Sequence, residues 1–210
     1  MKTDDVKKRR TVLARILATI GGMYAFQKAN ATSTTPSATE GPFYPPRSMR
    51  KKDTDNDLVK IANQLNEAGG EIIWLKGQVV DKSGNALSGL RVEIWQCDMN
   101  GVYLHTGDSR SGKHDNAFQG FGHDITDDNG QYRFRTIKPA KYPGRTPHIH
   151  VKVCLEDKEL LTTQFYLKND PDNLNDSIFK RLTQTQANAV SMVFPDEGKE
   201  PTATVNITLS

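Results

Sequence analysis

Cysteine is nearly absent from this sequence: only Cys97 and Cys154 occur in 210 residues. Two cysteines are too few for a disulfide-based scaffold, and no Cys or Asp spacing typical of a zinc site is present. Each cysteine lies in an apolar, strand-like stretch, which predicts two buried free thiols. A Cys97–Cys154 disulfide is the alternative if the protein is exported.

The sequence also lacks an uninterrupted apolar run long enough for a transmembrane helix. The longest candidate, residues 12–26, is broken by an arginine and by a Gly-Gly pair. A double arginine precedes this segment, and Ala-Asn-Ala follows it at 29–31. This order predicts a twin-arginine signal peptide over residues 1–31, export to the periplasm or the cell exterior, and no stable membrane span after cleavage. The alternative is a retained basic helix on a cytoplasmic protein.

Residues 32–210, the body of the chain, have no strong excess of positive or negative charge. The formal net charge is +3, and residues 1–31 hold seven Lys or Arg and two Asp, which leaves −2 for the rest. A nearly neutral body gives no electrostatic basis for nucleic-acid binding. We therefore expect no nucleic-acid partner.

Residues 32–70 are predicted to form a linker and an N-terminal arm. Small polar residues fill 32–40 and cannot build a core. The Gly-Pro-Phe-Tyr-Pro-Pro stretch at 41–46 predicts a stiff extended segment, because proline is rejected from helix interiors and central strands. Weak helical spacing over 57–68, followed by Gly-Gly, predicts a short helix.

From residue 71 onward the sequence is typical of short strands separated by turns. Alternating or β-branched stretches cover 72–81, 90–95, 132–135, 148–155, 161–167 and 202–209. Residues 106–122 predict a long surface loop, and residues 179–193 a loose helix. Strands at short spacing without helical crossovers predict an all-β fold, a two-sheet antiparallel β-sandwich over 71–210 with short helical segments.

His148 and His150 indicate a metal site. Residues i and i+2 of a strand face the same side, so the two imidazoles are expected side by side. Tyr142 lies just upstream, and Tyr103 lies in an earlier turn-rich segment. Phenolate is a hard anionic ligand, so two tyrosines and two histidines favour Fe(III). Two surface histidines, or a copper or zinc site, remain the alternatives at this point.

A series of short motifs follows in order from residue 39 to at least residue 167. They are Thr39 to Pro46, Val92 to Asp98, Asn100 to Tyr103, Phe118 to Phe121, Thr126 to Gly130, Tyr132 to Phe134, Ile137 to Pro139, Tyr142-Pro143 and Arg145 to His150. Each motif alone is a weak signal, but together they resemble the intradiol ring-cleavage dioxygenases, the catechol and protocatechuate dioxygenase family. We therefore treat this family as the leading hypothesis.

The resemblance implies a non-haem Fe(III) cofactor on a β-sandwich of the prealbumin-like type. Tyr103 and Tyr142 match the two tyrosinate ligands of the family, with Tyr142 as the one displaced by substrate. His148 and His150 match the two imidazole ligands. The implied reaction combines a catechol-type ring with O2, cleaves the ring between its hydroxylated carbons and gives a muconate-type diacid.

Four further residues receive roles from the same resemblance. Arg145 and Gln164 match catalytic residues beside the bound substrate, and Phe43 and Tyr44 are expected to line the substrate pocket. The family resemblance also allows a homo-oligomer. The remaining histidines at 105, 114 and 123 are expected in surface loops.

Two features leave other hypotheses open. Only five residues separate Tyr142 from His148, a shorter loop than the family resemblance leads us to expect, so the substrate or the site opening can differ. Residues 77–81 and 127–134 also resemble non-catalytic β-sandwich binding modules. The third hypothesis is a His-x-His metal-binding protein without oxygenase activity.

Overall fold

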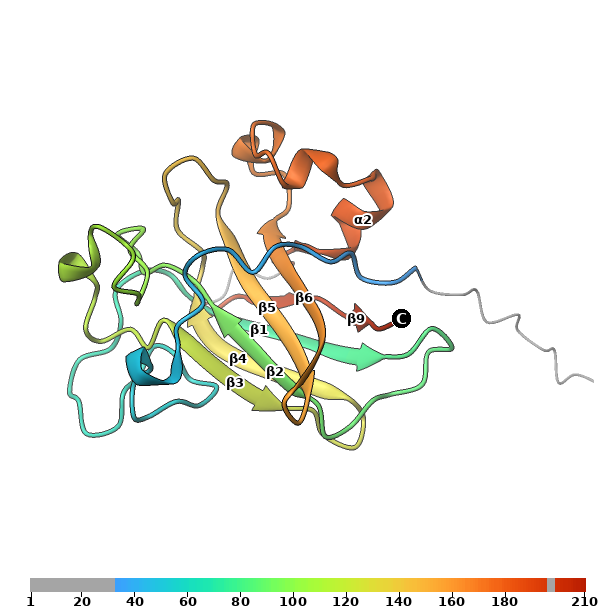
Figure 1. Ribbon diagram of the computed structural model, residues 1–210, viewed down its shortest axis with the longest axis horizontal. Helices are drawn as coiled ribbons and strands as arrows, with labels where there is room; N and C mark the ends of the chain where they lie inside the picture. Colours follow the sequence, from blue (N-terminus) through green and yellow to red (C-terminus); the bar gives the residue numbers. More distant parts are fainter. Residues whose placement is uncertain (1–32, 196–198) are drawn as a thin grey trace, which may run out of the picture. The chain divides into compact units, whose positions relative to one another are not determined.

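The computed structural model describes residues 33–195 and 199–210, which form two β-sheets around a shared core (Figure 1). One sheet contains β1 (Ile72–Val80), β4 (Gln131–Ile137), β8 (Thr202–Thr204) and β9 (Ile207–Thr208). The other has the order β3 (Phe121–Ile125), β2 (Arg91–Trp95), β5 (His148–Leu155), β6 (Lys158–Leu167) and β7 (Ser191–Met192). The helices of the described residues are α2 (Gln184–Ala189), η1 (Arg47–Met49), η2 (Ser111–Lys113), η3 (Pro171–Leu174) and η4 (Phe179–Arg181), of which the η elements are 3-10 helices. The predicted all-β sandwich is confirmed.

The core forms because alternate residues of the strands are apolar and face the other sheet. β1 contributes Ile73 and Leu75, and β5 contributes Ile149, Val151 and Val153, all completely buried. Burial of each such side chain contributes about 1.5–3 kcal/mol. The period-two pattern therefore fixes which face of β5 points into the sandwich.

The pairing of the strands is antiparallel in the centre of both sheets, with parallel pairs at short outer strands. β8 and β9 both run parallel to β1, and β7 runs parallel to β6. The single strand predicted over 202–209 is split into β8 and β9. β3 was not predicted, because its sequence Phe-Gly-His-Asp-Ile shows neither alternation nor a β-branched run.

The second face of the five-stranded sheet is covered by residues 33–46. Figure 1 shows this N-terminal arm, in blue, crossing β5 and β6. The Ala38 amide donates to the Thr162 carbonyl, and the Thr35 amide donates to the Thr208 carbonyl. Lys152 on β5 forms an ion pair with Glu40. The segment predicted as a linker is thus hydrogen-bonded to both sheets, through contacts between residues far apart in the sequence.

The helix predicted over 57–68 is wrong. The Leu58 amide donates to the Arg135 carbonyl, and the Ala68 amide donates to the Val59 carbonyl, so the segment folds back on itself and pairs with β4. Asp55 and Asp57 accept hydrogen bonds from nearby backbone amides and so compete with helical bonding. Leu65, an apolar position of the predicted helix, is fully exposed.

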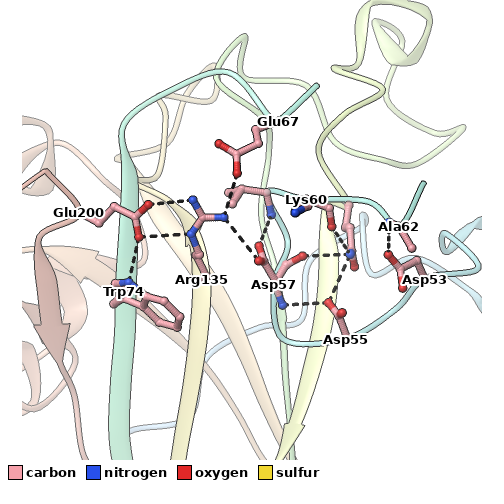
Figure 2. Close-up of polar contacts among 11 residues, drawn as sticks. Asp53, Asp55, Asp57, Lys60, Ala62, Glu67, Trp74, Arg135 and Glu200 are labelled. Carbon is pink, nitrogen blue, oxygen red and sulfur yellow. Dashed lines mark hydrogen bonds and ion pairs between the residues drawn. The ribbon is translucent and has the colours of Figure 1, made fainter. Parts of the chain in front are cut away.

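Arg135 on β4 fixes this segment to the sandwich (Figure 2). Its guanidinium donates to both carboxylate oxygens of Glu200, at 3.2 and 2.8 Å. It also contacts Asp57 and Glu67, each at 3.4 Å. Trp74 donates to the same Glu200 carboxylate at 3.0 Å. One arginine thereby joins β4, the 57–67 segment and the chain entering β8.

Both cysteines are buried and free, as predicted. The segment predicted as a signal peptide, 1–31, lies outside the described residues. Within the described ranges, no helix has the length and apolarity needed to cross a membrane.

Replacement of Arg135 by Gln is expected to lower the free energy of unfolding by about 1.5–3 kcal/mol, because hydrogen bonds to charged partners are lost in a mostly buried site. Urea denaturation measures this loss. Lys138→Gln is the control, since it breaks the exposed Lys138–Glu71 pair and is expected to cost less than about 1 kcal/mol. Equal losses in the two variants would contradict the role given to Arg135.

Candidate metal centre

His148 and His150 lie on the face of β5 that points away from the sandwich core. Ile149 between them is in the core, so the strand alternation places both imidazoles under the N-terminal arm. Their Nε2 atoms are 3.1 Å apart. Only 3% of His148 and 4% of His150 is exposed. The predicted side-by-side arrangement is therefore present on a rigid, buried strand.

Tyr103 brings a phenol oxygen to the same point from the loop after β2. This loop is fixed by two buried carboxylates: Asp98 accepts the Val102 amide, and Asp108 accepts the Tyr103 amide at 3.1 Å. The Tyr103 hydroxyl lies 3.3 Å from Nε2 of His148 and 3.2 Å from Nε2 of His150. The three atoms form a nearly equilateral triangle.

The triangle fits a bound metal ion. An ion held at about 2.0–2.1 Å by three atoms places those atoms roughly 3 Å from one another. Nδ1 of His148 lies 2.7 Å from the Thr146 carbonyl oxygen, which can only accept, so Nε2 of His148 is the unprotonated nitrogen. Among the described residues, no group of three or more His, Cys, Asp or Glu side chains is arranged for a metal, so the site depends on tyrosine oxygen.

Electrostatics favour the neutral imidazoles that a metal requires. Burial, followed by the charge of Arg145, lowers the pKa of His148 to about 4. Burial also lowers the pKa of His150 well below its ordinary value. Burial raises the pKa of Tyr103 well above its ordinary value, so the phenolate form needs a nearby cation.

Tyr142 lies beside the triangle without completing it. Its ring centroid is 5.3 Å from that of Tyr103, but its hydroxyl makes no hydrogen bond to the other three predicted ligands within the described ranges. Tyr142 and Arg145 are the first and last residues of a tight turn, because the Arg145 amide donates to the Tyr142 carbonyl at 3.0 Å. Pro143 and Gly144, with φ of 78° at the glycine, give a type II turn.

Arg145 and Gln164 are hydrogen-bonded to each other. The Nη2 group of Arg145 donates to Oε1 of Gln164 at 2.7 Å, and Tyr166 donates to the same oxygen at 2.9 Å. The Gln164 amide nitrogen donates to the Thr39 carbonyl of the arm. Gln164 is completely buried, so the structure places it as a support of Arg145.

The two predicted pocket residues separate in the structure. Phe43 stacks on Tyr103 with ring centroids 4.9 Å apart and meets the edge of Tyr142 at 5.6 Å. Tyr44 instead points along the sheet, where its hydroxyl donates to Glu93 at 2.7 Å. The Tyr44 ring contacts Trp95. Phe43 is therefore beside the site, whereas Tyr44 fixes the arm.

Two supporting residues were missed in the sequence. Trp95 pairs with His150 across the strands and stacks on its ring, with centroids 4.7 Å apart. Asp176 accepts the Arg145 guanidinium at 2.7 Å. Burial alone would raise the pKa of this carboxyl, but hydrogen bonds from Arg145 and from backbone amides lower it below its ordinary value. Strand pairing could have indicated Trp95, but no local pattern indicated Asp176.

Of the three histidines expected in surface loops, His105 and His114 do lie in loops but are partly buried, whereas His123 lies in a strand. His123 lies in β3. His105 packs against the Phe43 ring with centroids 5.7 Å apart. His114 is partly buried, and both of its ring nitrogens lack a hydrogen-bond partner within the described residues. Among the histidines of the described residues, only His148 and His150 lie within hydrogen-bond distance of the Tyr103 hydroxyl.

Comparison with known proteins gives consistent matches. A family model described as Dioxygenase matches residues 39–208. The protocatechuate 3,4-dioxygenase beta chain of Burkholderia cepacia is 38% identical over 134 residues, 60% of this chain and 57% of that protein. The hydroxyquinol 1,2-dioxygenase of Corynebacterium glutamicum is 27% identical over 198 residues, 84% of this chain and 61% of that protein. This chain therefore spans somewhat more than half the length of these curated relatives.

Solved structures include a similar protein of nearly the same extent. It is the dioxygenase domain of a dioxygenase–carbohydrate-binding protein fusion from Streptomyces sp. SirexAA-E, with a TM-score of 0.66 and 30% sequence identity. The similarity covers 85% of this chain and 99% of that chain. An intradiol ring-cleavage dioxygenase from Tetranychus urticae, 20% identical, has the same fold with a TM-score of 0.66 over 85% of this chain and 95% of that chain.

Replacement of Gly144 by Ala is expected to destabilise the fold by about 1–2 kcal/mol, because a Cβ is unfavourable at positive φ. The variant is also expected to weaken metal binding, since the turn carries Tyr142. Gly84→Ala is the matched control: its φ is 85°, and like Gly144 it has open space at the Cβ position. Chemical denaturation and metal titration measure both effects. Equal metal affinities in the two variants would show that the turn does not position a ligand.

Proposed function

We propose that this chain, which belongs to the intradiol ring-cleavage dioxygenase family, is a non-haem Fe(III) enzyme that cleaves catechol-type rings with O2. The observation that carries the proposal is the triangle of Tyr103, His148 and His150 with Arg145 close to it. A phenolate and two neutral imidazoles suit a ferric ion, and a fixed positive charge suits an anionic ring. The proposed products are muconate-type diacids.

The protein ligands divide into fixed and movable ones. Tyr103, His148 and His150 are buried on anchored backbone and would hold the ion throughout. Tyr142 is partly exposed, comes from a turn and has no hydrogen-bonded partner at its hydroxyl within the described residues. We assign Tyr142 as the fourth residue that would hold the ion and as the one that would move away for the substrate, when its oxygen would accept a proton from a substrate hydroxyl.

Arg145 would bind and orient the deprotonated substrate. Burial is the main cause that lowers the pKa of both imidazoles, with His148 next for His150, and the Arg145 charge lowers both further, so its field reaches the candidate metal site. A preorganised donor of this kind is worth roughly 3 kcal/mol of transition-state stabilisation. The bound ferric ion would supply the activation of the catecholate ring toward O2. Phe43, stacked on Tyr103, would exclude water from one side of the ring.

The substrate class follows from what the named relatives share. Protocatechuate and hydroxyquinol, in the names of two relatives, both carry adjacent ring hydroxyls. Catechol 1,2-dioxygenases are also among the relatives, for example one from Acinetobacter baylyi that is 29% identical. We therefore propose aromatic rings with two adjacent hydroxyls as substrates, together with O2.

Iron-loaded wild-type protein is expected to be red-brown through tyrosinate-to-iron charge transfer and to consume O2 with catechol, protocatechuate or hydroxyquinol. Mass spectrometry should show a product that contains the substrate and both oxygen atoms. His148→Ala should lose iron, colour and activity, because one corner of the triangle is removed. His123→Ala, in β3, is the matched control and should retain all three. A coloured His148→Ala protein, or a wild type inactive with every catechol, would contradict the proposal.

Export by a twin-arginine signal is a separate proposal, supported by the residue order at 9–31. The expected result is a mature protein that begins after the Ala-Asn-Ala stretch. N-terminal sequencing of the protein from the periplasm or medium measures this. A protein found only in the cytoplasm with Met1 retained would support the cytoplasmic alternative.

A further inference from the structure

Asp176 is a buried carboxylate that contacts the Arg145 side chain and the backbone just before His148, one of the candidate metal ligands. It lies between η3 and η4, and its side chain has 0% exposed area. Its Oδ2 accepts the Arg145 Nε at 2.7 Å and the Thr146 amide at 3.1 Å. Its Oδ1 accepts the amides of Ile178 and Phe179 at 2.9 and 2.8 Å. All four partners are donors.

We infer that Asp176 is a positioning residue that holds Arg145 and His148 in one arrangement for the proposed ring cleavage. This inference rests on the proposed function, because the roles of Arg145 and His148 come from it. Asp176 touches neither the triangle nor the expected substrate position, and it acts through the two residues that do.

The connection to Arg145 is direct. The guanidinium donates from Nε to Asp176 and from Nη2 to Gln164, each at 2.7 Å. Partners at two different nitrogens restrain the plane of a guanidinium more than one partner does. Only 18% of the Arg145 side chain is exposed, so water cannot readily replace the carboxylate.

The connection to His148 passes through one residue, Thr146. The Thr146 amide donates to Asp176, and the Thr146 carbonyl lies 2.7 Å from Nδ1 of His148. The Thr146 hydroxyl donates to Asn173 at 2.7 Å. Thr146 is thus held at its amide and its hydroxyl, and its carbonyl sets the orientation of the imidazole. Groups that orient metal-binding histidines typically change metal affinity or activity about 10–100-fold when they are removed.

The four-donor environment requires a carboxylate. An asparagine has the same shape, but one of its two polar atoms is an amide nitrogen that only donates. Whichever way it turns, this nitrogen faces either Arg145 and Thr146 or the backbone amides of Ile178 and Phe179. Asp176→Asn is therefore expected to release one side of the network with little change in volume.

The first test compares wild type, Asp176→Asn, Arg145→Gln and the double variant in the iron-loaded protein. Asp176→Asn should lower kcat/KM about 10–100-fold and speed iron release to a chelator about tenfold. If Asp176 acts through Arg145, adding Asp176→Asn to Arg145→Gln should lower kcat/KM by less than about threefold. Thr126→Val is the control, because it removes a buried side chain that bonds the Leu90 amide and the Leu87 carbonyl, and that has no hydrogen bond to Asp176 among the described residues.

Three outcomes would overturn the inference. In the first, Asp176→Asn has the kcat/KM and the iron release rate of the wild type. In the second, Thr126→Val shows the same changes as Asp176→Asn. In the third, the loss of kcat/KM in the double variant equals the product of the losses in the two single variants. An inactive wild type would instead contradict the proposed function, and iron release would still report on Asp176.

A second measurement needs neither the variant nor activity. Hydrogen exchange of arginine Nε–H groups, followed by NMR in metal-free wild-type protein, compares Arg145 with Arg133, whose side chain is exposed. The Arg145 proton is expected to exchange on the order of 100-fold more slowly, because its partner is buried. Equal exchange rates would show that Asp176 does not hold the guanidinium and would overturn the inference even if Asp176→Asn fails to fold.

Discussion

The alternation of side chains along β5 is the constraint on which the rest of the structure depends. Ile149, Val151 and Val153 are committed to the core, so His148 and His150 must face the other way. The imidazoles are consequently as rigid as the core itself. The same alternation creates a second face that needs covering, and residues 33–46 cover it. β5 therefore contributes to the core on one face, and on the other it carries the candidate metal ligands and contacts the N-terminal arm.

Charge is distributed unevenly around the site in a way that matches its proposed chemistry. The triangle is made of groups that burial keeps neutral, and it faces one guanidinium. That guanidinium is paired with the buried Asp176 carboxylate, so its charge has a partner of opposite sign. The resulting site can accept a cation at the triangle and an anion beside Arg145. These are the two requirements of a ferric ion that binds a catecholate.

The parts of this architecture that were predictable are those encoded by neighbours in sequence. The i, i+2 spacing placed His148 and His150, and the sequence at 142–145 contains the residues of its turn. Long-range contacts were not predictable. Residues 57–68 have helical spacing, yet Arg135 and the aspartates hold them as a segment that folds back on itself. Asp176 and Arg145 are 31 positions apart in the sequence, and only the folded chain brings them into contact. Its position near the histidines and the family resemblance group Tyr142 with the other ligands, and within the described residues its hydroxyl makes no hydrogen bond to them.

The pairing of the arm with β9 has a consequence for how the protein is made. Thr35 and Thr208 exchange hydrogen bonds across 173 positions of sequence. The arm therefore gains this anchor only after Thr208 has left the ribosome, although both histidines have emerged long before. Until then the imidazoles lack the completed cover of the folded protein. The compartment in which the last strand docks would therefore influence which ion the proposed metal site takes up.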